Sequence, residues 1–136
     1  MRSAPRLRFA AQDEGPVIKA LCAETKARIG DWLDWSQPLA QNWILAEYDR
    51  PVGCIQINYG TPIGRMEFLL VSPTLPLKQK ALVVRNLCYA ANAQLHRHGS
   101  QAVATSIDHA DPSWQRVVER RGAVPFATGT IYLKRL

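Results

Sequence analysis

The chain has 136 residues, of which 47% are hydrophobic and 21% are charged, and its net charge is +6. This length suits one globular domain with a real core, so we expect residues 1–136 to form a single domain behind a loose basic tail at residues 1–5. No apolar run approaches the roughly 18 residues of a membrane span, and the N-terminus lacks the apolar region of a secretion signal. We therefore expect an intracellular protein with no membrane partner.

The positive charges are spread along the chain rather than gathered in one block. A basic protein can bind nucleic acid, a phosphate-bearing cofactor or an acidic protein surface, but no basic run here alternates with aromatic residues. Nucleic acid is therefore a partner without a supporting motif. Cys22, Cys54 and Cys88 lie far apart in apolar stretches, which is typical of buried reduced thiols. The sequence indicates neither disulfides nor a metal site.

The first elements are expected to be a short strand at Leu7–Ala10 and an amphipathic helix at Glu14–Ile29. Asp13 is the expected N-cap of this helix, and Pro16 is tolerated in its first turn. Gly30 is expected to end it.

The next five residues contain two tryptophans and two carboxylates, and they are read as a short helix or a structured loop. Tryptophans this close together are more typical of a lid over the core than of a ligand platform. The carboxylates beside them could still attract a cationic substrate. The residues in question are Asp31, Trp32, Asp34 and Trp35.

The middle of the chain changes to a period of two residues, which predicts strands. Strands at 43–48 and 52–59 form a hairpin around Asp49-Arg50-Pro51, and a turn at Gly60–Gly64 leads to a strand at Met66–Val71. Ser72-Pro73 is expected to end that strand, because proline donates no N–H to a sheet.

A nine-residue loop is expected next, followed by a long helix from about Ala81 to His98. Gly99 stands where a left-handed residue closes helices. A buried strand that runs through a loop into a helix is a common phosphate-binding arrangement, because the first helical N–H groups are unpaired. The apolar residues that recur at helical spacing are Val84, Leu87, Cys88, Ala91 and Leu95.

The C-terminal part is expected to contain a strand at Ala102–Ile107 and a helix at Ser113–Arg121 with Asp111 as its N-cap. Closing strands are expected at Ala123–Phe126 and Thr130–Leu133. The full order is β-α-(α)-β-β-β-α-β-α-β, which is an α/β (α+β) arrangement.

This order resembles the GCN5-related N-acetyltransferase (GNAT) family, whose members move an acyl group from coenzyme A to an amine. Three segments carry the resemblance: AEYDRPVGCIQI with Gly53, FLLVSP followed by a helix ending in HRHG, and DPSWQRVVERRGAVP…GTIYLKRL. The resemblance implies a mixed, mostly antiparallel central sheet flanked by helices. It also implies acetyl-CoA as cosubstrate, no metal, and an amine-bearing small molecule or protein as acceptor.

The chain departs from the family pattern in two places. The family's loop carries Gln/Arg-x-x-Gly-x-Gly/Ala, whose glycines let N–H groups approach the pyrophosphate, whereas residues 77–83 contain no glycine. Lys78 and Lys80 could supply charge instead. Val118 stands where the family often has a tyrosine that protonates the leaving thiolate. An alternative is therefore a catalytically inactive scaffold that joins other protein subunits in an assembly, such as a bacteriophage particle.

The resemblance also implies roles for individual residues. Glu67 is the first candidate general base, because a desolvated carboxylate is suited to removing a proton from an ammonium group; the alternative is that it lies at the solvent edge beside Arg65. His109 is the second candidate base. The expected cofactor-binding residues are Leu69, Leu70, Val71, Lys78, Gln79, Lys80, Ala81, Leu82 and Asp111. The acceptor side is expected to be lined by Asp31, Trp32, Asp34 and Trp35.

Overall fold

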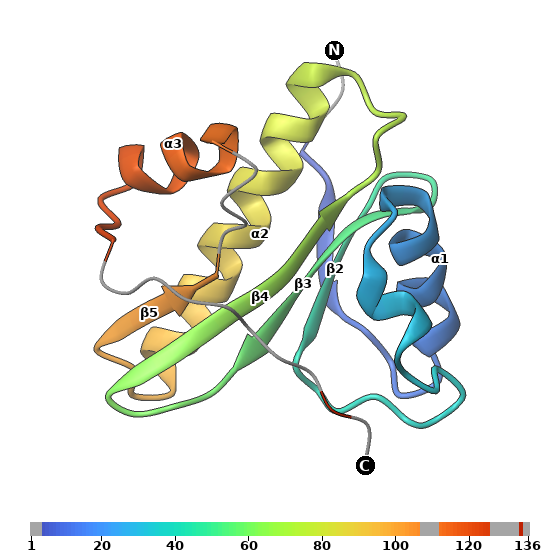
Figure 1. Cartoon of the computed structure of the whole chain (residues 1–136), viewed down its shortest axis with the longest axis horizontal. Coiled ribbons are helices and arrows are strands. Elements are labelled where there is room, and N and C mark those ends of the chain that lie inside the picture. The colour runs from blue at the N-terminus through green and yellow to red at the C-terminus, as the bar shows by residue number, and fades with distance from the viewer. Residues whose placement is uncertain (1–3, 107–111, 126–133, 135–136) are drawn as a thin grey trace. The chain divides into compact units, whose positions relative to one another are not determined.

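A computed structural model of the chain describes residues 4–106, 112–125 and 134 (Figure 1). The chain divides into two compact units, Met1–Thr105 and Ser106–Leu136, which are described separately. The first unit holds one sheet with the strand order β1-β2-β3-β4-β5. Its strands are β1 (Arg6–Phe9), β2 (Trp43–Glu47), β3 (Pro51–Asn58), β4 (Ile63–Val71) and β5 (Ala102–Thr105), and its helices are α1 (Gly15–Thr25), the 3-10 helix η1 (Arg28–Asp31) and α2 (Leu77–Arg97).

The sheet is mixed and mostly antiparallel, as predicted. Strands β1 to β4 pair antiparallel in chain order, and β5 pairs parallel with β4. Helices α1 and α2 cover opposite faces of the sheet (Figure 1). The α2-side core contains Ile44, Ala46, Val52, Ile55, Ile57, Val83, Leu87, Ala91 and Leu95. The α1-side core contains Ala10, Ile18, Leu21, Cys22, Trp35, Trp43, Leu45 and Cys54.

Helix α2 begins four residues earlier than the expected Ala81, so the loop before it spans only residues 72–76. Pro76 is the N-cap, and the N–H of Lys80 donates to the Pro76 carbonyl oxygen at 3.0 Å. A proline lacks the N–H that a helix start leaves unpaired, so it is well tolerated there. The expected C-terminus is confirmed, since Gly99 has a φ of +94°.

Helix α1 is shorter than the expected Glu14–Ile29 and ends at Thr25. Lys26 adopts a left-handed φ of 58°, and the N–H of Ala27 donates to the Cys22 carbonyl oxygen at 2.9 Å. This pairing closes the helix without a glycine. The N-cap is Glu14 rather than Asp13.

Gly53 of β3 lets α2 lie close to the sheet. A Cβ at this position would stand 2.8 Å from Val83 Cγ1 and 3.0 Å from the Leu70 carbonyl oxygen. Any side chain would therefore push α2 away from β3 and open the core between them.

The second unit contains α3 (Pro112–Arg120). Gly122 has a φ of +89°, and the N–H of Ala123 donates to the Val118 carbonyl oxygen at 3.1 Å, which closes the helix. The strand expected from Ala123 is therefore not formed over residues 123–125. The strand expected at Thr130–Leu133 lies outside the described residues, as do His109 and Asp111.

Candidate functional site

Strand β4 continues past the end of its parallel neighbour β5. The pairing runs from Ile63 opposite Ala102 to Met66 opposite Thr105, whereas β4 extends to Val71. Figure 1 shows β4 running on beyond β5. Within the described residues, the β5-side edge of residues 67–71 therefore has no strand partner, and its backbone groups can pair with an extended ligand.

A bulge marks the point where β5 ends. Phe68 has a φ of +52°, and the β3–β4 register shifts between Cys54 and Gln56. Met66 and Leu69, three residues apart, both pack against the α2-side core, so the alternation of side chains changes phase here. A left-handed conformation costs a non-glycine residue about 1–3 kcal/mol, and such strain is concentrated at functional sites.

The N-terminus of α2 follows β4 after a five-residue loop. The amides of Leu77, Lys78 and Gln79 precede the first helical hydrogen bond, which Lys80 makes to Pro76. Unpaired N–H groups and the helix dipole attract anions at such a terminus. Lys78 and Lys80 therefore belong to the first turn of a helix, not to a loop as expected.

Gln79 is a buried polar residue in the apolar stripe of α2. It is 9% exposed and is followed at four-residue spacing by the buried Val83, Leu87 and Ala91. Its Oε1 has no hydrogen-bond partner among the described residues. An unsatisfied buried acceptor costs about 1–3 kcal/mol, and a ligand that donates a hydrogen bond would recover this.

Glu67 lies one residue beyond the last β4–β5 pair. Its side chain is 23% exposed and forms an ion pair with Arg65, with Nη2 2.6 Å from Oε1. The Arg65 Nε donates to the same oxygen at 2.7 Å. Glu67 is thus partly exposed and paired with Arg65, which is the arrangement that the solvent-edge alternative describes.

The four residues expected on the acceptor side have different environments. Trp35 is buried, its Nε1 donates to the Gly30 carbonyl oxygen at 3.0 Å, and its ring lies edge-on to that of Trp43. Asp34 is exposed and accepts hydrogen bonds from the Ser36 hydroxyl and N–H at 2.6 and 3.1 Å, and the pKa of Asp34 falls mainly because of the hydroxyl. Asp31 and Trp32 are exposed. Trp35 thus belongs to the core, while the other three lie at the surface.

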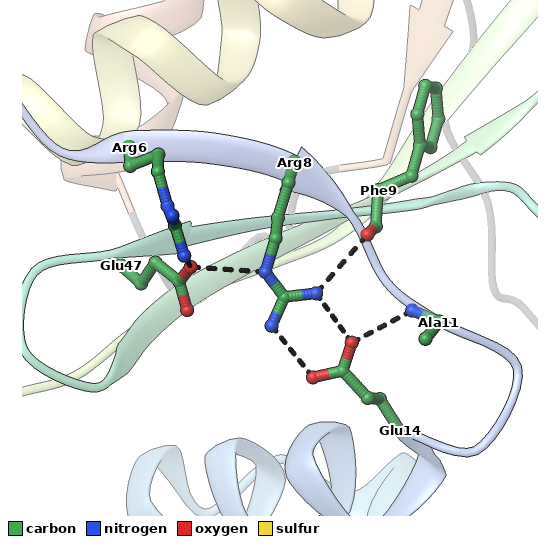
Figure 2. A network of polar contacts seen from close by, with 6 residues as sticks. All are labelled: Arg6, Arg8, Phe9, Ala11, Glu14 and Glu47. Atoms are coloured by element: carbon green, nitrogen blue, oxygen red, sulfur yellow. Dashed lines mark hydrogen bonds and ion pairs between the residues drawn. The ribbon is translucent and has the colours of Figure 1, made fainter.

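A polar network that the sequence did not indicate joins β1, β2 and α1 (Figure 2). Arg8 donates to Glu14 at 2.5 and 2.8 Å and to Glu47 at 3.1 Å, and Arg6 pairs with Glu47 as well. The hydrogen bonds from Arg8 lower the pKa of Glu14 to about 2. Glu47 is buried at one end of β2, so these ion pairs hold it charged inside the sheet.

A second unexpected network lies beside the loop before α2. It joins Glu24 of α1, Arg50 of the β2–β3 turn and Ser72 after β4. Glu24 and Ser72 are 48 residues apart, and the sequence offers no signal for their contact. Ser72 was expected only to end a strand.

The described residues contain no group of three or more histidine, cysteine or acidic side chains placed to hold a metal ion. Burial raises the pKa of the Cys22 and Cys54 thiols, so both stay protonated. Over the same residues, no helix has both the length and the apolar character to cross a bilayer.

The sequence matches no protein-family model and no curated protein. Several solved structures are similar. A complex of AAC(6')-Iy with the bisubstrate analog CoA-S-monomethyl-acetylneamine has a TM-score of 0.72 and 15% identity, over 98% of this chain and 100% of that chain. A GNAT-family acetyltransferase from Streptococcus pneumoniae TIGR4 has a TM-score of 0.66 and 16% identity, over 96% and 97%. A transcriptional regulator from Bacillus halodurans C-125 has a TM-score of 0.69 and 12% identity, over 96% and 99%. The chain has the GNAT fold, which confirms the fold inferred from its sequence.

Proposed function

We propose that this protein is an acyl-CoA-dependent N-acyltransferase that transfers an acetyl group to an amine. The observation that carries the proposal is one juxtaposition on the GNAT fold. The unpaired edge of β4 beyond Met66 leads, within one short loop, to the open N-terminus of α2. An extended ligand with amide groups and a phosphate end matches this arrangement.

The cosubstrate would be held by backbone groups and a few side chains. Its amide-bearing arm would pair with Leu69, Leu70 and Val71, and Gln79 Oε1 would accept a hydrogen bond from it. The phosphates would lie at the first turn of α2, where Lys78 and Lys80 add charge to the free N–H groups. The remaining expected contacts are Ala81 and Leu82 of the same helix, and Asp111. Acetyl-CoA supplies an acyl group that is activated as a thioester.

Glu67 is the proposed general base. It would take a proton from the acceptor ammonium, directly or through a water, and leave a neutral amine that can attack the acyl carbon. As the amide bond forms, the C–S bond of the thioester would break, and CoA would leave as a thiolate that takes up the second proton of the amine. Arg65 holds the carboxylate in place. His109 is the second candidate for this role.

An amine is the proposed acceptor, on a small molecule or a protein. The similar AAC(6')-Iy is an aminoglycoside N-acetyltransferase, which acts on such a group. On this chain, Asp31, Trp32 and Asp34 present two carboxylates and an indole at the surface, and these could attract a cationic acceptor. Trp35 would contribute from the core beneath them.

The first test is thermal unfolding of the purified protein with and without millimolar acetyl-CoA. A ligand at about 100 times its Kd stabilises the native state by about 2.7 kcal/mol, so we expect the melting temperature to rise by several degrees. The rise should shrink strongly in the K78A/K80A variant. It should persist in K19A/R28A, a control that removes two exposed charges outside the candidate site.

Absence of any shift for the wild-type protein would contradict the proposed activity and leave the inactive scaffold as the better hypothesis. A shift of equal size in the wild-type protein and K78A/K80A would instead place the phosphates away from α2.

A further inference from the structure

The loop between β4 and α2 is anchored through Ser72, which is completely buried. Its N–H donates to the Val52 carbonyl oxygen at 2.7 Å, and its hydroxyl donates to Glu24 Oε1 at 2.7 Å. The same hydroxyl lies 2.9 Å from Thr74 Oγ1. The start of the loop is thus bonded to both β3 and α1.

Arg50 in the β2–β3 turn joins this anchor. Its Nη2 donates to Glu24 Oε1 at 3.0 Å, and to the hydroxyl oxygens of Ser72 and Thr74 at 3.2 Å each. Its Nη1 lies 3.4 Å from Glu24 Oε2. One guanidinium therefore links α1, the turn and the loop. We call Glu24, Arg50, Ser72 and Thr74 the loop brace.

The charges of the loop brace balance one another. The hydroxyl of Ser72, and after it Arg50, lower the pKa of Glu24, so this carboxylate is ionised at neutral pH. Arg50 is the cation that compensates it. Without Arg50, an uncompensated negative charge would stand beside the loop that leads into α2, and it would repel an anionic ligand there.

The position of the α2 N-terminus depends on this loop. It spans only residues 72–76, two of which are prolines, and it contains no glycine. The amides of Leu77, Lys78 and Gln79, which precede the first helical hydrogen bond, follow directly. A displacement of about 1 Å at a binding group can cost on the order of a hundredfold in rate. Because the loop brace holds the start of this short loop, it also sets the position of the three α2 amides, which it does not contact.

We infer that Glu24 and Arg50 are positioning residues for the phosphate end of the cosubstrate. This inference rests on the proposed function. The brace acts in two ways: it fixes Ser72 and Thr74 so that the α2 amides point at the ligand, and it keeps the local charge near neutral.

The test is a set of dissociation constants for CoA, measured by calorimetry on the wild-type protein, R50A, R50K, E24Q and R50A/E24Q. We expect R50A to weaken binding by at least about tenfold, and R50K to weaken it less, because lysine keeps the charge but loses the planar fork. The double variant should bind more tightly than R50A, since it also removes the unpaired carboxylate. R28A, which removes an exposed arginine from η1, is the matched control.

A second ligand separates positioning from general structural damage. Pantetheine lacks the phosphates, and its weak binding can be followed through amide resonances. We expect R50A to lose affinity for CoA but to retain that for pantetheine, with little change in melting temperature. An equal loss for both ligands, or unfolding of every variant including E24Q, would overturn the inference and assign the brace to stability.

The two proposals fail in different ways. Wild-type protein that does not bind millimolar CoA overturns the proposed function, and this inference with it. Wild-type protein that binds CoA while R50A binds equally well overturns the brace alone. If R50A/E24Q binds CoA as weakly as R50A does, the proposed repulsion by the unpaired Glu24 carboxylate is overturned.

Discussion

At the scale of single residues, Glu67 is the proposed general base, and it lies at the bulge where β5 ends and β4 continues. The Arg65 ion pair explains how a carboxylate is held at this point of the sheet. Gln79, in contrast, has a buried oxygen without a partner in the described part of the chain. The Glu67 carboxylate thus has a fixed partner, whereas the Gln79 oxygen has none within the described residues.

Changing Glu67 to Gln should lower kcat by about 10²–10⁴-fold, because general base catalysis contributes that much. The Kd for acetyl-CoA should stay within about twofold of the wild-type value. The change keeps the side-chain volume, and Glu67 is not among the proposed cosubstrate contacts, which begin at Leu69. Steady-state kinetics with an amine acceptor and calorimetry measure the two quantities. Asp13→Asn, at an exposed carboxylate, is the control. Full activity in E67Q would move the role to His109 or to no side chain.

Glu14 gives the protein a defined dependence on acid. Arg8 lowers its folded pKa from 4.5 to about 2, so the ionised carboxylate stabilises the fold above pH 4.5. That contribution, on the order of 2 kcal/mol, is lost as the pH falls from about 4.5 to about 2. In urea unfolding, E14Q should therefore have a clearly lower free energy of unfolding than the wild type at pH 7, and this difference should shrink towards pH 3. A difference that is constant with pH would show that Arg8 does not stabilise the charged form. E119Q is the exposed control.

At the scale of elements, two parts of helix α2 have different roles. Its inward stripe from Val83 to Leu95 packs against the sheet, and its first turn places three amides ahead of the first helical hydrogen bond, close after the end of β4. Gln79 lies in the first turn and is also the first buried residue of the inward stripe. Gly53 lets the helix approach β3, which fixes how the first turn stands over the sheet.

Replacing Gln79 with Leu should raise the free energy of unfolding by about 1 kcal/mol, because it removes an unsatisfied buried acceptor. The same change should weaken acetyl-CoA binding by about fivefold, since the proposed hydrogen bond is lost. Urea unfolding and calorimetry measure the two effects. Q79E, which buries a charge, should act in the opposite direction on stability. A destabilised Q79L would show that Oε1 already has a partner.

At the scale of the whole molecule, the fold is shared by proteins of different function, including acetyltransferases and a transcriptional regulator. The fold alone therefore does not decide between an active enzyme and a scaffold. The proposal of an enzyme rests on the loop before α2, on the α2 N-terminus and on the edge of β4 that has no strand partner among the described residues. That residues 1–136 form one domain stays a prediction.

The sequence by itself determined the order and type of the described elements, because apolar spacing of two or of three to four residues reports directly on strands and helices. It also placed the proline that follows β4 and the glycine that closes α2. Boundaries that depend on capping were wrong: Lys26 ends α1 in a left-handed conformation, and Pro76 starts α2 early. Local spacing does not reveal which of several residues will take a cap.

Only the tertiary structure decided which side chains meet. The contacts of Arg50 with Glu24 and Ser72, and of Arg6 and Arg8 with Glu47, join residues 22 to 41 positions apart. Such contacts follow from strand register and helix placement, which no local pattern encodes. The bulge at Phe68, the length of β4 beyond β5 and the burial of Gln79 have the same origin. The sequence therefore indicated the segment that is proposed to bind the cosubstrate, and the packing of distant segments determined how that segment is held.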